Sequence, residues 1–230
     1  MNNFHVKEFI ALLVKKIINF FLKSFFILLY HQFAWGYDFI AWIVSGGKWT
    51  EWGKEIIHYF KEPKILELGY GTGHLQAYLA QNGYLSYGID ASSQMTDLTS
   101  RRLSNQNISG RIVRGTSEAL PFKGEYFDSV FAVFPSEYIF RSSTILECIR
   151  VLNPGGIFIT LLGVNILPKG IYSYLLSLVY RLTRQGTPDT QFLENFLLRL
   201  NNAGLPGKVK WQSINNYQLL FLICKKDAPY

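Results

Sequence analysis

The sequence predicts an α/β protein built on a mostly parallel sheet, and three observations lead to this prediction. From Lys64 onward, short apolar runs alternate with stretches of helical periodicity, which is typical of βαβ units. A glycine-rich turn directly follows the first apolar run, as in parallel sheets that bind nucleotides. Near the carboxyl end, two apolar strands flank Asn215-Asn216, a turn that predicts a closing antiparallel hairpin.

Composition fits one α/β domain with a modest appendage. The chain has 230 residues, of which 49% are hydrophobic and 17% charged, and its formal net charge is +7. The basic residues are scattered without regularly interleaved aromatics, so we expect no nucleic-acid partner. Cys148 and Cys224 lie in apolar stretches without a second cysteine or histidine at ligand spacing. They predict buried thiols in a reducing cytosol, with neither a disulfide nor a metal site.

Residues 9–30 predict an amphipathic helix with a wide apolar face. Lys15, Lys16 and Lys23 interrupt the apolar residues, which argues against a helix that spans a membrane. Two interpretations stay open: the helix packs on the α/β domain, or it lies on a membrane surface with its lysines near anionic headgroups. We accordingly expect a cytoplasmic protein, which the second interpretation would make peripheral on the inner face of the membrane.

Aromatic residues are frequent between Tyr30 and Phe60. Core packing is the simpler interpretation and substrate contact is the other; both hold if these helices cover a binding site. We therefore divide the chain in two. Residues 1–60 are amino-terminal amphipathic and aromatic helices, forming a cap or a membrane-surface element, and residues 61–230 are the α/β domain.

The first βαβ unit begins with a strand at 64–68 and continues into a helix at 75–80. Between them, Gly69 and Gly71 allow the backbone to pass close under a ligand, and Gly73 is expected to permit tight packing of the helix on the strand. A dinucleotide fingerprint, G-x-G-x-x-G, would need glycine at position 74, where this chain has His74. The observed spacing therefore disfavours an NAD-dependent oxidoreductase.

The second strand, at 84–89, ends in Asp90, which lies 21 residues after Gly69. A carboxylate at this distance from a glycine-rich turn is suited to accept two hydrogen bonds from a ribose diol. The alternative is that Asp90 only caps the helix that starts near Ser93. Ser92 is the better cap, so ribose binding is favoured.

The later elements follow in regular order. They are a loop at 115–122, a strand at 127–134, a helix at 143–152, a turn at 153–156, a strand at 157–162, an apolar insertion at 163–191, and hairpin strands at 208–214 and 218–224. Because open α/β sheets bind ligands at the carboxyl ends of their strands, Phe134 is expected to border the site.

Together these motifs resemble those of class I S-adenosylmethionine-dependent methyltransferases. Within that class the resemblance is to the type 11 branch, which includes ubiquinone and menaquinone biosynthesis methyltransferases. The matching runs are E-x-G-x-G-x-G at 67–73, G-I-D-A at 88–91, G-T-S-E-A-L-P-F at 115–122, F-D-x-V at 127–130 and R-V-L-x-P-G-G at 150–156. The resemblance implies a Rossmann-like fold with a mostly parallel seven-stranded sheet and a closing antiparallel hairpin. The implied cofactor is S-adenosyl-L-methionine.

The resemblance also implies a set of site residues. The cofactor-binding residues that it suggests are Glu67, Gly69, Tyr70, Gly71, Gly73, Asp90, Ala91, Met95, Thr116, Ser117, Glu118 and Phe134. Glu67 would help to bind the methionine ammonium, and Ala91 and Met95 would flank the adenine, although Met95 fits ordinary core packing equally well. Thr116 stands where the family more commonly has aspartate, so its hydroxyl would bond the adenine amino group less strongly than a carboxylate.

The predicted function is methyl transfer to a small apolar or amphipathic acceptor. The apolar insertion at 163–191 and the aromatic amino-terminal helices would together form a lid over it. Four residues are candidate general bases, His31, His74, Glu137 and Tyr138, and the sequence assigns the role to none of them. The alternative is a catalytically inactive scaffold that binds S-adenosylmethionine without transferring its methyl group.

Overall fold

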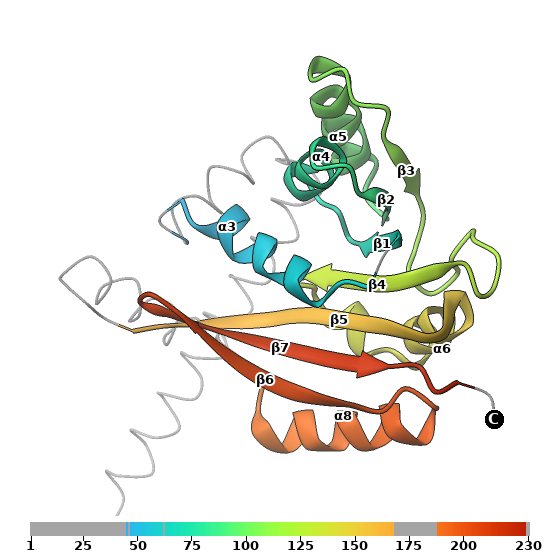
Figure 1. The fold of residues 1–230 in the computed structure, drawn as a ribbon, viewed down its shortest axis with the longest axis vertical. Coiled ribbons are helices and arrows are strands. Elements are labelled where there is room, and N and C mark those ends of the chain that lie inside the picture. The colour runs from blue at the N-terminus through green and yellow to red at the C-terminus, as the bar shows by residue number, and fades with distance from the viewer. Residues whose placement is uncertain (1–44, 46, 62, 168–187, 229–230) are drawn as a thin grey trace, which may run out of the picture.

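The computed structural model describes residues 45, 47–61, 63–167 and 188–228, and these form a seven-stranded sheet in the order β3-β2-β1-β4-β5-β7-β6 (Figure 1). The strands are β1 (Lys64–Leu68), β2 (Leu85–Asp90), β3 (Arg111–Arg114), β4 (Phe127–Val133), β5 (Leu152–Ile166), β6 (Gly207–Ile214) and β7 (Tyr217–Lys225). The helices are α3 (Trp49–Lys54), η1 (Glu55–Tyr59), α4 (His74–Gln81), α5 (Ser93–Asn105), η2 (Glu137–Phe140), α6 (Ser142–Val151) and α8 (Thr190–Asn202).

The predicted sheet is confirmed. Strands β3, β2, β1, β4 and β5 pair in parallel, and β7 pairs antiparallel with both β5 and β6. The carboxyl ends of the five parallel strands therefore lie at one edge of the sheet. Side chains at 65–68 on the central strand β1 are all buried, because both faces of a parallel sheet are covered.

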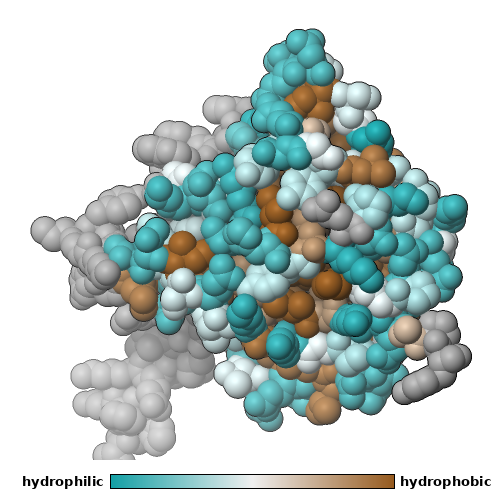
Figure 2. Space-filling view, in the orientation of Figure 1, coloured by the Kyte–Doolittle hydropathy of each residue, from teal (hydrophilic) through white to brown (hydrophobic). Residues whose placement is uncertain are grey.

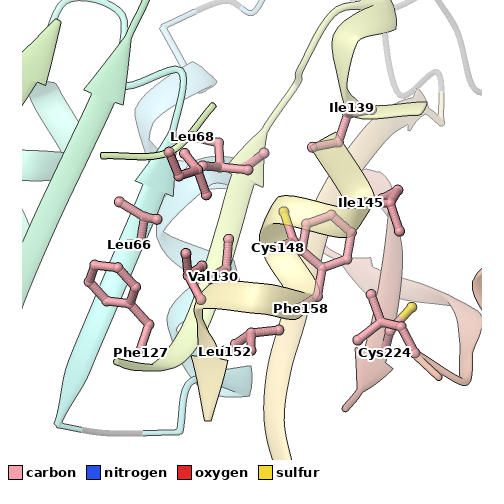
Figure 3. Close-up of a cluster of buried hydrophobic side chains, with 14 of the residues drawn as sticks. Leu66, Leu68, Phe127, Val130, Ile139, Ile145, Cys148, Leu152, Phe158 and Cys224 are labelled. Carbon is pink, nitrogen blue, oxygen red and sulfur yellow. The ribbon is translucent and has the colours of Figure 1, made fainter. Parts of the chain in front are cut away.

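Each face of the sheet has its own hydrophobic core. On one face, α6 and α8 pack against the strands, as Figure 3 shows for Cys148 of α6 beside Val130 of β4 and Phe158 of β5. On the other face, Trp52 and Ile56 pack with strand side chains that include those of Phe131 and Phe221. The sheet is thus the middle layer of three, which holds the strand ends in fixed positions.

The described amino-terminal residues belong to the second core. Trp52 of α3 is 3% exposed and Ile56 of η1 is fully buried, and the Tyr59 and Phe60 rings contact the Phe221 and Phe131 rings. Core packing, the simpler of the two interpretations, is therefore confirmed for these aromatics. The predicted helix at 9–30, most of the aromatic stretch and His31 lie outside the described residues. No helix within the described ranges has the length and apolarity needed to cross a bilayer.

The surface of the described part is mainly polar, with apolar side chains in small patches (Figure 2). The large exposed apolar residues are Val113, Leu146, Leu167, Phe192, Leu198 and Trp211. Both cysteines are free and buried, as predicted, and burial raises the pKa of each thiol above its usual range. Both thiols are consequently protonated and unreactive at neutral pH.

Strand β5 differs from its prediction at both ends. It begins at Leu152, so the predicted turn at 153–156 lies inside the strand as a bulge: Phe127 pairs with Leu152, and the register then shifts so that Ser129 pairs with Ile157. The strand also runs on to Ile166, because its last residues pair with β7 up to Tyr217. The predicted insertion at 163–191 therefore starts later than expected, and its central part, 168–187, lies outside the described residues. Strand β3 was not predicted as a strand.

Asp128 of the F-D-x-V run joins three strands at the amino edge of the sheet. Its Oδ2 accepts a 3.1 Å hydrogen bond from the Lys64 backbone N–H at the start of β1. Its Oδ1 accepts a 2.8 Å bond from the Asn153 side chain in the β5 bulge. This aspartate is therefore structural and lies at the edge opposite to the carboxyl ends of the strands.

Candidate functional site

The predicted site residues lie along the carboxyl edge of the parallel strands. The glycine-rich loop at 69–73 follows β1, Asp90 ends β2, the loop at 115–126 follows β3, and Phe134 follows β4. Short backbone bonds hold these segments together: the Gly69 N–H donates to the Ile89 carbonyl at 2.7 Å, and the Gly115 N–H donates to the Asp90 carbonyl at 2.9 Å. The fold thus brings together segments that are far apart in the sequence.

The glycine-rich loop is held from below by helix α5. The Thr99 hydroxyl donates a 2.8 Å hydrogen bond to the Gly71 carbonyl, and the Arg102 guanidinium donates to the Thr72 carbonyl. With two carbonyls bound by α5, the loop has a defined conformation. Neither Thr99 nor Arg102 was predicted as a site residue. The sequence signal that could have identified them is their spacing of three residues, which places both on one face of a helix.

All three loop glycines have left-handed backbones, but their surroundings differ. Gly71 has φ +54°, and a Cβ at this position would meet no atom within 4 Å, so the space beside it is open. Gly73 has φ +76°, and a Cβ there would overlap the Thr99 side chain. The closest contact at Gly73 is therefore with α5, whereas the prediction concerned packing of its own helix on the strand. At Gly69, the nearest atom to a Cβ would be the Tyr138 hydroxyl, at 2.6 Å.

Asp90 joins the loop to the end of β2. Its Oδ2 accepts a 2.9 Å bond from the Gly71 N–H, and its Oδ1 accepts a 2.9 Å bond from the Ser92 N–H. Ser92 is the N-cap of α5, as predicted, and accepts from the Met95 N–H. Because each carboxylate oxygen can accept more than one hydrogen bond, these two contacts are compatible with a further bond to a ligand diol.

Glu67 is a buried carboxyl near the end of β1, with 3% of its surface exposed. The Gln76 side-chain amide on α4 donates a 2.6 Å hydrogen bond to its Oε2. Burial raises the pKa of Glu67 from 4.5 to about 8, and the charge of Asp90 acts in the same direction. A cationic ligand group would stabilise the ionised carboxylate and reverse this effect.

The residues predicted to contact adenine fall into two groups. Ala91 and Thr116 are exposed at the carboxyl edge, whereas Met95 has no exposed surface, which favours core packing for the methionine. The Ser117 hydroxyl lies 3.0 Å from that of Thr144 on α6. The side chains at 117 and 118 are thus held by neighbouring elements, since Glu118 pairs with Arg141.

The Tyr70 side chain points away from the open edge of the loop. The residue is 4% exposed, and its hydroxyl lies 2.8 Å from that of Thr96 on α5. A ligand contact from this residue would therefore involve its backbone and not its phenol.

Helix α6 fixes the loop that follows β3. The Glu147 carboxylate accepts a 2.7 Å bond from the Leu120 N–H, and Arg150 donates to the carbonyls of Leu120 and Phe122 at 2.9 and 2.8 Å. Glu147 and Arg150 are also paired with each other. This loop contains no helix or strand, and its order comes from these side chains.

An aromatic group lies beyond the end of β4. Phe134 has φ +46°, a conformation that is rare for a bulky residue, and its N–H donates a 2.8 Å bond to the Leu161 carbonyl. Its ring centroid is 4.3 Å from that of Trp49 and 6.2 Å from that of Trp52. Phe134 and Trp49 are both half-buried.

Tyr138, one of the candidate bases, contacts the end of β1. Its hydroxyl donates a 2.9 Å bond to the Leu68 carbonyl. His74 and Glu137 are exposed.

Residues 66–160 match a family model described as a methyltransferase domain. Over these residues the chain is similar to methyltransferase domains, as the motifs predicted. The match covers β1 to β5, the segment that contains all of the motifs described above. It supports the methyltransferase prediction over the dehydrogenase alternative.

Relatives with curated names agree with this assignment. Demethylmenaquinone methyltransferase of Thermotoga maritima is 31% identical over 134 residues, covering 56% of this chain and 57% of that protein. A ubiquinone/menaquinone biosynthesis C-methyltransferase of Geotalea daltonii is 31% identical over 129 residues, covering 52% and 55%. The aligned part of the chain thus spans just over half the length of these relatives.

A solved structure shows the same fold. Geranyl diphosphate C-methyltransferase of Streptomyces coelicolor, solved with S-adenosyl-L-homocysteine, has a TM-score of 0.57 at 13% identity, covering 77% of this chain and 79% of that one.

The methyltransferase domain has a site whose residues fit its cofactor, S-adenosyl-L-methionine. The space beside Gly71 is open, as a ligand that lies against the backbone requires. Two buried carboxyls, Glu67 and Asp90, border the loop and suit a ligand that carries positive charge and a diol. Gln76, which holds Glu67, was missed by sequence reasoning, because a glutamine inside a helix carries no signal of its own.

Proposed function

We propose that this protein transfers a methyl group from S-adenosyl-L-methionine to a small apolar or amphipathic acceptor. The observation that carries the proposal is the arrangement at the glycine-rich loop: an open backbone surface at Gly71 lies directly beside the Asp90 carboxylate, whose Oδ2 is 2.9 Å from the Gly71 nitrogen. Backbone and carboxylate at this distance can bind two parts of one nucleoside ligand.

The proposed cofactor roles follow from the positions of the side chains. When bound, S-adenosyl-L-methionine supplies an electrophilic methyl group on a positively charged sulfur. Asp90 would accept hydrogen bonds from the ribose hydroxyls. Glu67 would face the ammonium group of the amino-acid end, and the exposed Thr116 hydroxyl would bond the adenine amino group. Orienting the two reactants and excluding water are then the main contributions of the protein.

The acceptor is proposed to lie against the aromatic group formed by Trp49 and Phe134. Both rings are half-buried at the carboxyl end of β4, and rings in this setting bind apolar molecules through their large contact area. The names of the relatives also support a small molecule, since they refer to demethylmenaquinone and geranyl diphosphate. Attachment to a membrane through residues 9–30 and a lid within 163–191 stay predictions.

Binding measurements test the cofactor assignment. We expect S-adenosyl-L-homocysteine to bind in calorimetry and NAD not to bind. Asp90→Ala should weaken S-adenosyl-L-homocysteine binding by about 1.5 to 3 kcal/mol, which is roughly tenfold or more. Binding of NAD, or equal affinity in the variant, would contradict the assignment.

Detection of a methylated product distinguishes an active methyltransferase from an inactive scaffold. The protein is incubated with methyl-labelled S-adenosyl-L-methionine and with apolar extracts or polar extracts as the acceptor source. Label recovered in an apolar product supports the proposal. Cofactor binding without any labelled product in either extract would favour the scaffold, and label in polar products alone would contradict the acceptor class.

A further inference from the structure

Two buried side chains that the proposed mechanism does not use, Ser86 and Gln76, are linked by hydrogen bonds to Glu67, which it does use. The Ser86 hydroxyl on β2 donates a 2.9 Å hydrogen bond to Oε1 of Gln76. The Gln76 amide nitrogen then donates to Glu67 Oε2 at 2.6 Å and to the Tyr87 carbonyl at 3.3 Å. Ser86, Gln76 and Glu67 are each 5% exposed or less.

The partners of Gln76 fix the orientation of its amide. Its oxygen faces a hydroxyl donor, and its nitrogen faces two acceptors, so rotating the amide by half a turn would place like groups against each other. The amide nitrogen therefore remains a donor toward Glu67. Oε2 of Glu67 is thereby held as an acceptor, and a proton on this carboxyl is directed to the other oxygen, Oε1.

The surroundings of Glu67 favour its protonated form until a cation arrives. The groups that interact electrostatically with it are Asp90 on β2 and Tyr70 in the loop; the facing residue of β4 is Phe131, and α4 contributes the neutral Gln76. Among the described residues, no cation pairs with Glu67 and no hydrogen bond reaches its Oε1. A cationic ligand group would thus be the first positive charge near this carboxyl.

We infer that Gln76 is a positioning residue that directs the Glu67 proton to Oε1, so that binding of the ammonium group at the cofactor's amino-acid end releases this proton to solvent. The inference rests on the proposed function, because it requires the cofactor to bind beside Glu67. The proton leaves Oε1 as the ammonium group approaches, and the site then holds a carboxylate paired with a cation. Cofactor binding is consequently coupled to pH.

The test measures protons released on binding. Calorimetric titrations with S-adenosyl-L-homocysteine are run at pH 7 in buffers of different ionisation enthalpy. With a Glu67 pKa of about 8, we expect about one proton released per site at pH 7 and fewer at pH 8.5. Adenosine, which lacks the amino-acid end, should release none. Failure of S-adenosyl-L-homocysteine to bind would contradict the proposed function, whereas binding without proton release would overturn only this inference.

Two variants and a matched control test the role of Gln76. Gln76→Ala should weaken S-adenosyl-L-homocysteine binding about tenfold at pH 7. It should also shift the pH dependence of affinity upward, because the hydrogen bond that it removes holds the pKa of Glu67 lower. Gln81→Ala removes an exposed glutamine from the same helix, whose side chain bonds that of Gln106, and should bind as the wild type does.

Ser86→Ala tests the role of Gln76 if Gln76→Ala fails to fold. It removes the donor that orients the Gln76 amide, so affinity should fall by a smaller factor with a pH shift in the same direction. A structural role alone would lower thermal stability without moving the pH dependence. An unchanged pH profile in folded Gln76→Ala, or in Ser86→Ala where the first variant does not fold, would overturn the inference.

Discussion

The Thr99 hydroxyl donates a 2.8 Å hydrogen bond to the Gly71 carbonyl, which joins helix α5 to the glycine-rich loop at its most open residue. Because Thr99 is fully buried, water cannot replace this bond without rearrangement. The conformation of the loop therefore depends on a side chain that lies 28 residues further along the chain.

Thr99→Val tests this dependence, since it keeps the shape of the side chain and removes the hydroxyl. The free energy of unfolding should fall by about 1 to 3 kcal/mol, because the Gly71 carbonyl loses its donor. Affinity for S-adenosyl-L-homocysteine should fall as well, measured by calorimetry. Ser100→Ala, which removes an exposed hydroxyl from the same helix, is the control and should change neither quantity. Unaltered ligand affinity in Thr99→Val would show that the bond does not shape the site.

Gly73→Ala should destabilise the protein through backbone strain and through overlap with Thr99. A substitution at Gly83, which has the strain without the overlap, distinguishes the two contributions. Gly73 has φ +76° and faces Thr99, whereas Gly83 has φ +81° and a Cβ added there would meet no atom within 4 Å. Gly83→Ala therefore measures the backbone cost alone, about 1 to 2 kcal/mol. Gly73→Ala should cost about 1 to 3 kcal/mol more because of the overlap with Thr99. Urea unfolding measures both variants, and equal losses would contradict the close contact.

Because the backbone of Phe134 is left-handed, we expect the glycine variant at this position to be more stable than the alanine variant. Replacing Phe134 with alanine or glycine removes the same ring contacts with Trp49 and Trp52. Glycine tolerates φ +46°, so Phe134→Gly should be more stable than Phe134→Ala by about 1 kcal/mol. Elsewhere in a strand or helix the order is the reverse. Chemical denaturation of the two variants gives the answer, and greater stability of the alanine variant would mean that the strain is absent.

Glu67 predicts a pH dependence of stability in the ligand-free protein. Its pKa is about 8 in the folded protein against 4.5 for the ordinary group. Between these values the folded state holds a proton that the unfolded state has lost, so the free energy of unfolding falls as pH rises through this window. Glu67→Gln should lose less stability than the wild type between pH 5 and pH 8 in thermal unfolding. Parallel curves for the two proteins would show that Glu67 does not titrate in this range.

Sequence patterns predicted most of the fold because the relevant signals are local. The glycine run, the Asp90 position and the Asn215-Asn216 turn each specify backbone geometry within a few residues, and the structure has β1, β2 and the hairpin where these signals put them. The β5 bulge was missed because proline and paired glycines predict a reversal equally well. Only the pairing of Leu152 with Phe127 extends the strand through them.

The site was predicted less completely because its supporting contacts are long-range. Asp90 was found from its spacing to the glycines and Glu67 from the family resemblance, but their partners Gly71 and Gln76 could be identified only once the strands were assembled. For Tyr70, the sequence does not indicate whether the side chain or the backbone faces the open edge of the loop. Its place within the glycine run suggested a ligand contact, yet its phenol packs toward Thr96.

The bonds from α6 to the loop after β3 have a consequence for protein engineering. Residues 117–122 are tied to Thr144, Arg141, Glu147 and Arg150, whereas the side chain of Thr116 is exposed just ahead of them. If Thr116 contacts the adenine as proposed, a change at this single position would alter which purine analogue the site accepts while the rest of the loop keeps its conformation. Libraries that seek selectivity for bulky synthetic cofactors would begin at Thr116.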